Sequence, residues 1–131
     1  MRLKPRARTF HYSLGRRGEN AACDFLTRRG YEILERNYFE RSGEIDLIAK
    51  KGETIVFAEV KTRRSSRFGA PEEAAHFQKQ RKIIRLAARY LSLKGLTENP
   101  VSFDVLAVDW PPGREPEIRH YENAFEAGEE L

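Results

Sequence analysis

The sequence has few of the residues that crosslink a chain or hold it in a membrane. Its 131 residues include one cysteine, Cys23, so no disulfide can form within the chain, which indicates a reducing compartment. No apolar run approaches the length of a membrane span, and the basic residues of segment 1–8 lack the hydrophobic stretch of a secretion signal. We therefore expect a soluble, cytoplasmic protein that does not bind membranes.

Internal repeats and low-complexity linkers are also absent, which excludes repeat architectures and favours one domain. The three histidines, at positions 11, 76 and 120, do not have the spacing of metal ligands. We expect a flexible basic arm at 1–9, one folded domain at 10–125 and an acidic tail at 126–131.

Charge is distributed unevenly along the chain. Residues 1–94 contain 22 Lys and Arg against 11 Asp and Glu, a net charge of +11, whereas residues 95–131 contain 2 against 9, a net charge of −7. A basic surface suits a phosphodiester substrate, but a solvated arginine-rich surface explains the same numbers. Charge therefore suggests nucleic acid as a partner without deciding the matter.

Hydrophobic periodicity predicts an α/β domain. Apolar residues recur at helical spacing within 11–29 and after Pro71 up to Gly95, and apolar strands are expected at 31–38, 44–50, 54–62 and 101–109, with a short edge strand at 117–121. The strand at 54–62 is apolar on both faces, as a strand in the middle of a covered sheet must be. The order α-β-β-β-α-β-β predicts a mixed central β-sheet flanked by helices.

Three charges interrupt these apolar strands. Asp46 lies within 44–50, and Glu59 and Lys61 lie two residues apart within 54–62, so the latter two share one face. The short turn at Lys51-Gly52-Glu53 makes the two strands antiparallel neighbours, which brings Asp46 and Glu59 together. Two buried carboxylates need compensation, and their oxygens suit Mg²⁺.

Glu19 is a third candidate acid, because it extends the apolar stripe of the first helix and should point toward the sheet. The alternative is structural. Lys61 would then form an internal ion pair with Glu59 or Asp46, without any metal.

Several short segments, in order along the chain, make the sequence resemble the YraN family of bacterial proteins, which is itself similar to the PD-(D/E)XK nuclease superfamily and to archaeal Holliday-junction resolvases. The resemblance covers roughly residues 12–125. The segments are Leu14-Gly15-Arg16-Arg17-Gly18-Glu19, Gly43-Glu44-Ile45-Asp46-Leu47-Ile48, Phe57-Ala58-Glu59-Val60-Lys61, Lys79-Gln80-Arg81-Lys82, Phe103-Asp104-Val105-Leu106-Ala107 and Asn123-Ala124-Phe125.

The resemblance implies a restriction-endonuclease-like fold and a metal-dependent endonuclease that cleaves DNA, including branched DNA. Asp46, Glu59 and Glu19 would hold Mg²⁺ or Mn²⁺, and Lys61 and Gln80 would complete the catalytic set. The superfamily's resolvases imply a homodimer. The chain departs from the family pattern at Ala75-His76-Phe77-Gln78, just ahead of Lys79-Gln80.

Arginines near these acids are candidates for binding phosphates without reading base sequence. They are Arg16 and Arg17 beside Glu19, and Arg63, Arg64 and Arg67 in the loop after Lys61. The same basic surface fits a second hypothesis, a nucleic-acid-binding module on a nuclease-like fold without catalysis. Only the enzyme requires the complete set of acids.

Overall fold

The computed structural model describes residues 13–64 and 77–128. The predicted basic arm lies outside these residues, as do Arg67 and residues 129–131 of the predicted tail. None of the helices in the described ranges combines the length and hydrophobicity that crossing a bilayer requires.

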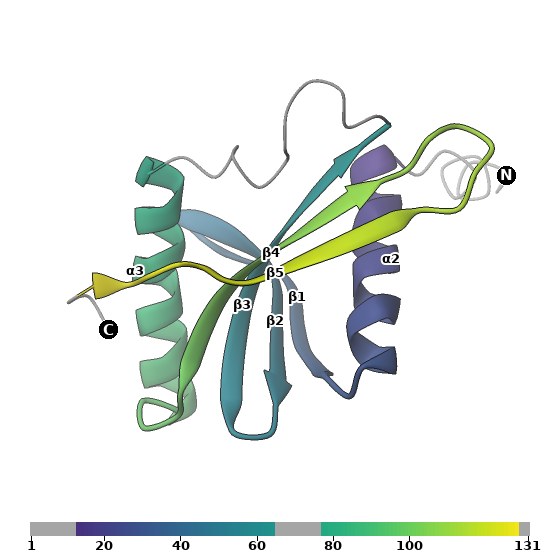
Figure 1. Cartoon of the computed structure of the whole chain (residues 1–131). Helices are drawn as coiled ribbons and strands as arrows, with labels where there is room; N and C mark the ends of the chain where they lie inside the picture. Colours follow the sequence, from purple (N-terminus) through teal and green to yellow (C-terminus); the bar gives the residue numbers. More distant parts are fainter. Residues whose placement is uncertain (1–12, 65–76, 129–131) are drawn as a thin grey trace, which may run out of the picture.

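The architecture is a five-stranded mixed sheet with one helix on each face (Figure 1), which confirms the predicted α/β class and is consistent with a restriction-endonuclease-like fold. The element bounds, in chain order, are α2 Leu14–Arg28, β1 Glu32–Glu40, β2 Gly43–Lys51, β3 Thr54–Arg63, α3 Phe77–Lys94, β4 Val101–Asp109 and β5 Glu117–Phe125.

The strands lie in the sheet in their order along the chain. Only β3 and β4 pair in parallel, because α3 connects them across one face, while the other three pairs are antiparallel. As a result, β3 and β4 end at the same edge of the sheet where α2 and α3 begin (Figure 1).

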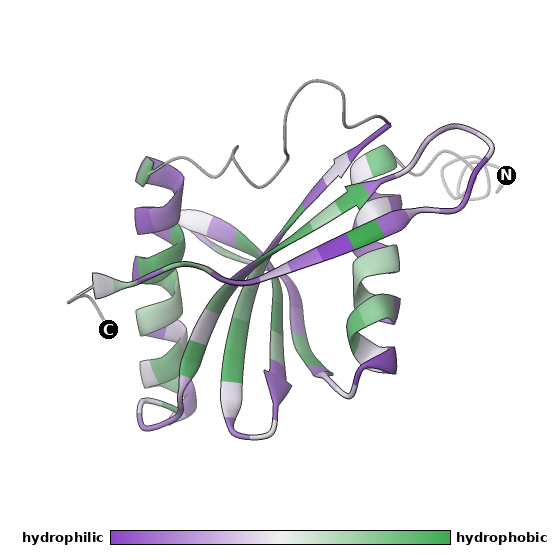
Figure 2. Cartoon of the chain, in the orientation of Figure 1, coloured by the Kyte–Doolittle hydropathy of each residue, from purple (hydrophilic) through white to green (hydrophobic). Residues whose placement is uncertain are grey.

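Two separate cores cover the two faces of the sheet, and the hydrophobic sides of both helices turn toward it (Figure 2). Ile55 and Phe57 of β3 pack under α3, whereas Val56 and Ala58 pack under α2. Strand β4 is buried along nearly its whole length. The apolar residues on both faces of β3 and β4 are thus explained by a helix on each side.

The first helix begins later than the periodicity suggested. Ser13 caps it, since its Oγ accepts a hydrogen bond from the Arg16 backbone N–H at 3.1 Å. The helix then ends at Arg28, and Gly30 follows with a φ of 90°.

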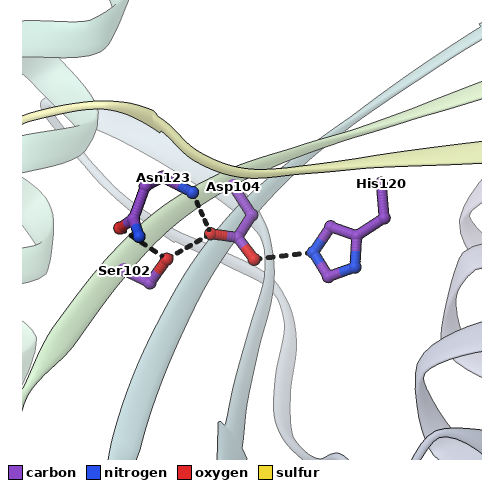
Figure 3. A network of polar contacts seen from close by, with 4 residues as sticks. All are labelled: Ser102, Asp104, His120 and Asn123. Carbon is purple, nitrogen blue, oxygen red and sulfur yellow. Dashed lines mark hydrogen bonds and ion pairs between the residues drawn. The ribbon is translucent and has the colours of Figure 1, made fainter.

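Strand β5 is longer than the predicted 117–121 because an irregularity at Asp104 lets pairing continue to Phe125. Asp104 is buried, and its carboxylate accepts a hydrogen bond from the Asn123 backbone N–H at 3.1 Å (Figure 3). The same carboxylate contacts Ser102 Oγ and lies 2.7 Å from His120 Nε2. This network compensates the buried charge and gives Asp104 a structural role.

Helix α2 approaches β3 most closely at Gly18. A Cβ there would lie 1.8 Å from Thr62 Oγ1, so no larger residue fits without displacing the strand or the helix. We predict that Gly18→Ala lowers the free energy of unfolding by about 1–3 kcal/mol in urea titrations, although alanine favours the helix.

Gly15→Ala is the matched control, because the nearest heavy atom to its new Cβ would be Ser13 Oγ at 4.0 Å. It should not be destabilised, and it gains up to about 1 kcal/mol from helix propensity. Equal stability of the two variants would contradict the close packing at Gly18.

Candidate active site

Strands β2 and β3 bring the two predicted acids together. Leu47 pairs with Ala58, so the antiparallel register places Asp46 across from Glu59. Ladder pairing between the two strands begins at Leu47 and does not include Asp46. The two carboxylates therefore face the point where β2 separates from β3.

The separation has a local cause in Asp46 itself. Its Oδ2 accepts a hydrogen bond from the Val60 backbone N–H at 2.8 Å, so the side chain satisfies a donor that a strand carbonyl would otherwise satisfy. Ile45 packs in the core under α3 and Leu47 in the core under α2, although residues two apart in a regular strand share a face. Strand β2 is thus irregular at Asp46.

Glu59 is a buried carboxylate compensated by two lysines. The residue is 2% exposed, and its Oε2 lies 3.2 Å from Lys61 Nζ and also forms an ion pair with Lys79. Within the described residues, neither oxygen of Glu59 has a further hydrogen-bond partner. Lysines alone compensate the charge through Oε2, and Oε1 has no partner among the described residues, so this oxygen can bind another positive group.

These groups open onto a cavity of about 440 Å³ between the sheet and the start of α3. Its walls carry three acids and two lysines, and the lining residues are Gly43, Glu44, Asp46, Glu59, Gln78, Lys79, Lys82 and Ile83. Lys61 is not among them. A cavity lined by both carboxylates and lysines can hold a cation and an anionic ligand side by side.

Burial raises the pKa of Asp46 from 3.8 to about 6. The hydrogen bond from Val60 lowers this pKa, whereas the negative charges of Glu19 and Glu59 raise it further. Asp46 is therefore ionised at neutral pH at a cost to the fold. Acids that repel one another in this way form a favourable environment for a cation.

The other predicted residues occupy different places. Glu19 on α2 is half-buried and close enough to affect the pKa of Asp46, but it is not part of the cavity lining. Gln80 does not line the cavity either; Gln78 and Lys79 do. Arg17 and Arg64 line a neighbouring cavity, Arg16 is exposed on α2, and Arg63 ends β3.

Lys79 was given no role from the sequence, yet it contacts Glu59 directly. Burial lowers the pKa of Lys79, but the adjacent Glu59 outweighs this effect and the pKa is raised. A crossover helix that follows β3 starts near the end of that strand, so a lysine in its first turn was a usable signal.

The donor set fits a hard divalent cation. Asp46 and Glu59 supply carboxylate oxygens, which Mg²⁺ and Mn²⁺ prefer, and the cavity has room for water ligands. Among the described residues, no three His, Cys, Asp or Glu side chains form a group that could hold a metal. Two acids, completed by water or substrate oxygens, are what this geometry offers.

Comparisons with known proteins place the chain among bacterial relatives. The profile of the uncharacterised protein family UPF0102 matches residues 18–108. A UPF0102 protein of Symbiobacterium thermophilum is 49% identical over 114 residues, which cover 87% of this chain and 97% of that protein. One of Rhodococcus jostii is 46% identical over 113 residues, which cover 86% and 96%. The names of these relatives state no activity.

The raised pKa of Asp46 predicts a stability cost that depends on pH. An acid whose pKa is higher in the folded chain destabilises the fold as pH rises through the range from about 3.8 to 6. Asp46→Asn keeps an oxygen for the Val60 N–H and removes the charge. We predict a gain of up to about 3 kcal/mol at pH 8 in urea unfolding, shrinking to about 1 kcal/mol near pH 4.5.

Glu44→Gln is the control, since Glu44 is an exposed carboxylate two residues away. It should leave the free energy of unfolding within about 0.5 kcal/mol of wild type at both pH values. A loss of stability in Asp46→Asn at pH 8 would contradict the electrostatic picture of the site.

Proposed function

Because the chain belongs to the uncharacterised protein family UPF0102, also called YraN, whose description assigns no reaction, we propose a function from the site itself: metal-dependent hydrolysis of phosphodiester bonds in DNA. The observation that carries this proposal is the placement of Asp46 opposite Glu59 in a cavity lined by acids and lysines, with Lys61 3.2 Å from Glu59. The likeness to the PD-(D/E)XK superfamily remains a prediction.

Asp46 and Glu59 would hold the cation through their carboxylate oxygens. A bound Mg²⁺ or Mn²⁺ would neutralise the phosphate, stabilise charge in the transition state and lower the pKa of a bound water. Glu19 would contribute through its charge, since it stands outside the cavity lining but influences Asp46.

The two lysines divide the remaining tasks. Lys61 lies on the same strand face as Glu59, where its ammonium group can orient the attacking water or stabilise negative charge that develops on the phosphate. Lys79 is nearly half exposed, with 46% of its side chain accessible, and can turn from Glu59 to a phosphate oxygen when a substrate enters.

Cleavage assays test this proposal. Purified protein with Mg²⁺ or Mn²⁺ should cleave at least one of single-stranded, duplex and four-way-junction DNA, and Asp46→Asn and Lys61→Met should each lower the rate by about 100-fold or more. Arg85→Met, which removes a charge from an exposed position on α3, should retain the rate.

Equal cleavage by wild type, Asp46→Asn and Lys61→Met would contradict the assignment of the site. Binding without cleavage, for every substrate and both metals, would favour the alternative of a non-catalytic nucleic-acid-binding module. A homodimer, implied by the resemblance to resolvases, stays a prediction that light scattering can check.

Metal binding can be measured without any reaction. Mn²⁺ should raise the melting temperature of the wild-type protein, because a ligand that binds only the folded chain stabilises it, and should not raise that of Glu59→Gln. Glu53→Gln, at an exposed position in the β2–β3 turn, is the matched control and should show the wild-type shift. The same shift in Glu59→Gln would remove Glu59 from the metal site.

A further inference from the structure

Two cavities on the side of the molecule near α2 meet at a single tryptophan. One has a volume of about 520 Å³ and lies along α2, and the other has about 480 Å³ and lies against the β4–β5 loop. Arg17, Trp110 and Glu115 line both. Neither cavity includes Asp46 or Glu59 in its lining, so this surface is separate from the candidate active site.

Trp110 is fixed in place by the backbone around it. Its backbone N–H donates to the Arg63 carbonyl at 2.7 Å, and its indole Nε1–H donates to the Arg114 carbonyl at 2.8 Å. It is half-buried and belongs to neither core cluster of the described residues. A rigid aromatic ring that does little for the core suits the recognition of a ligand.

Arginine dominates the charged residues around this ring. The guanidinium of Arg17 lies 4.3 Å from the centre of the Trp110 ring. Together the two cavities are lined by five arginines and two acids, namely Arg17, Arg28, Arg29, Arg64, Arg114, Asp24 and Glu115. The excess of positive charge selects an anionic ligand.

The β3–β4 pairing places Trp110 at the end of the two strands next to the candidate active site. Lys61 pairs with Ala107 and Arg63 with Asp109, and Trp110 follows directly. Glu59 contacts Lys79 of α3, whereas the cavities at Trp110 lie along α2, so the two surfaces are on opposite faces of the sheet. A polyanion that contacts both must pass around the end of β3 and β4. Both strands end at the edge of the sheet where α2 and α3 begin (Figure 1).

We propose that the Arg17–Trp110 surface binds single-stranded nucleic acid, with an unpaired base stacked on the indole and the arginines on the flanking phosphates. Stacking on a protein ring needs a base that is free of its own duplex, whereas a duplex offers the arginines only its phosphates. The inference rests on the proposed function, since it names a second contact of the same DNA substrate, away from the cleaved bond.

Trp110 is the only tryptophan in the chain, so protein fluorescence reports this surface directly. In EDTA, where metal-dependent cleavage is blocked, oligothymidylate should quench the emission, and a blunt duplex should quench it weakly. With a labelled oligothymidylate, fluorescence anisotropy should give Trp110→Ala an affinity about 5- to 150-fold weaker than that of wild type, and Trp110→Phe an intermediate one.

Arg17→Ala should weaken binding and reduce its dependence on salt, because one phosphate contact is lost. Arg85→Ala is the matched control, since it removes the same charge from the opposite face of the sheet, and it should bind as wild type does. Circular dichroism checks that each variant is folded. If Trp110→Ala is not folded, Trp110→Phe, which keeps an aromatic ring, serves in its place.

Three results would overturn the inference. The first is that both Trp110 variants bind oligothymidylate with wild-type affinity. The second is that a blunt duplex quenches the emission as strongly as oligothymidylate does. The third is quenching by polyglutamate but not by oligothymidylate, which would indicate that the surface binds an acidic protein. Because EDTA blocks metal-dependent cleavage, these measurements report binding independently of cleavage.

If the protein binds single strands but no metal-loaded sample cleaves DNA, only the proposed function is contradicted. If the protein cleaves DNA but oligothymidylate neither quenches Trp110 nor binds the Trp110 variants more weakly, only the inference is contradicted.

Discussion

The hydrogen bond from the Val60 N–H to Asp46 Oδ2 is the interaction on which the candidate site depends. It ends the regular pairing of β2 and β3 without leaving a buried backbone donor unsatisfied. The strands can therefore separate at Asp46, and the space between them becomes part of a cavity rather than a continuation of the core. A local irregularity in one strand thus opens the sheet at one place while the remaining register is kept.

The site gathers charge that the fold itself does not need. Glu59 is buried and contacts one lysine from a strand and one from a helix. Asp46 is ionised at neutral pH although burial and two neighbouring acids raise its pKa. Replacing a whole buried ion pair by apolar residues of similar volume is often neutral or stabilises a fold. Residues that work against stability in this way are typical of functional sites.

Much of the fold follows from sequence pattern, because β3 and β4 are apolar on both faces and need a helix on each side. The bounds of β4 were predicted as 101–109, and those of β5 fell four residues short. The shortfall has a physical cause: Asn123 adopts a φ of 52°, and its N–H bonds to the Asp104 carboxylate instead of a strand carbonyl. Local pattern does not encode that contact.

The candidate site was predictable only in part for a similar reason. Asp46, Glu59 and Lys61 interrupt apolar strands that a short turn connects, so their proximity could be inferred from the chain. Lys79 reaches Glu59 through the α3 crossover, which joins residues far apart in sequence. Its position in the first turn of that helix was the only sign of this contact, because tertiary contacts of this kind follow no fixed spacing in the sequence.

The single parallel pair also determines how the charge of Glu59 is compensated. Strands β1, β2 and β3 pair as antiparallel neighbours, whereas β4 pairs with β3 through the α3 crossover. Lys61 is a neighbour of Glu59 on β3 itself, but Lys79 and the apolar cover of α3 come from that crossover. The connection that makes two strands parallel therefore also supplies the second cation and the burial of this carboxylate, so sheet topology and site electrostatics have one origin.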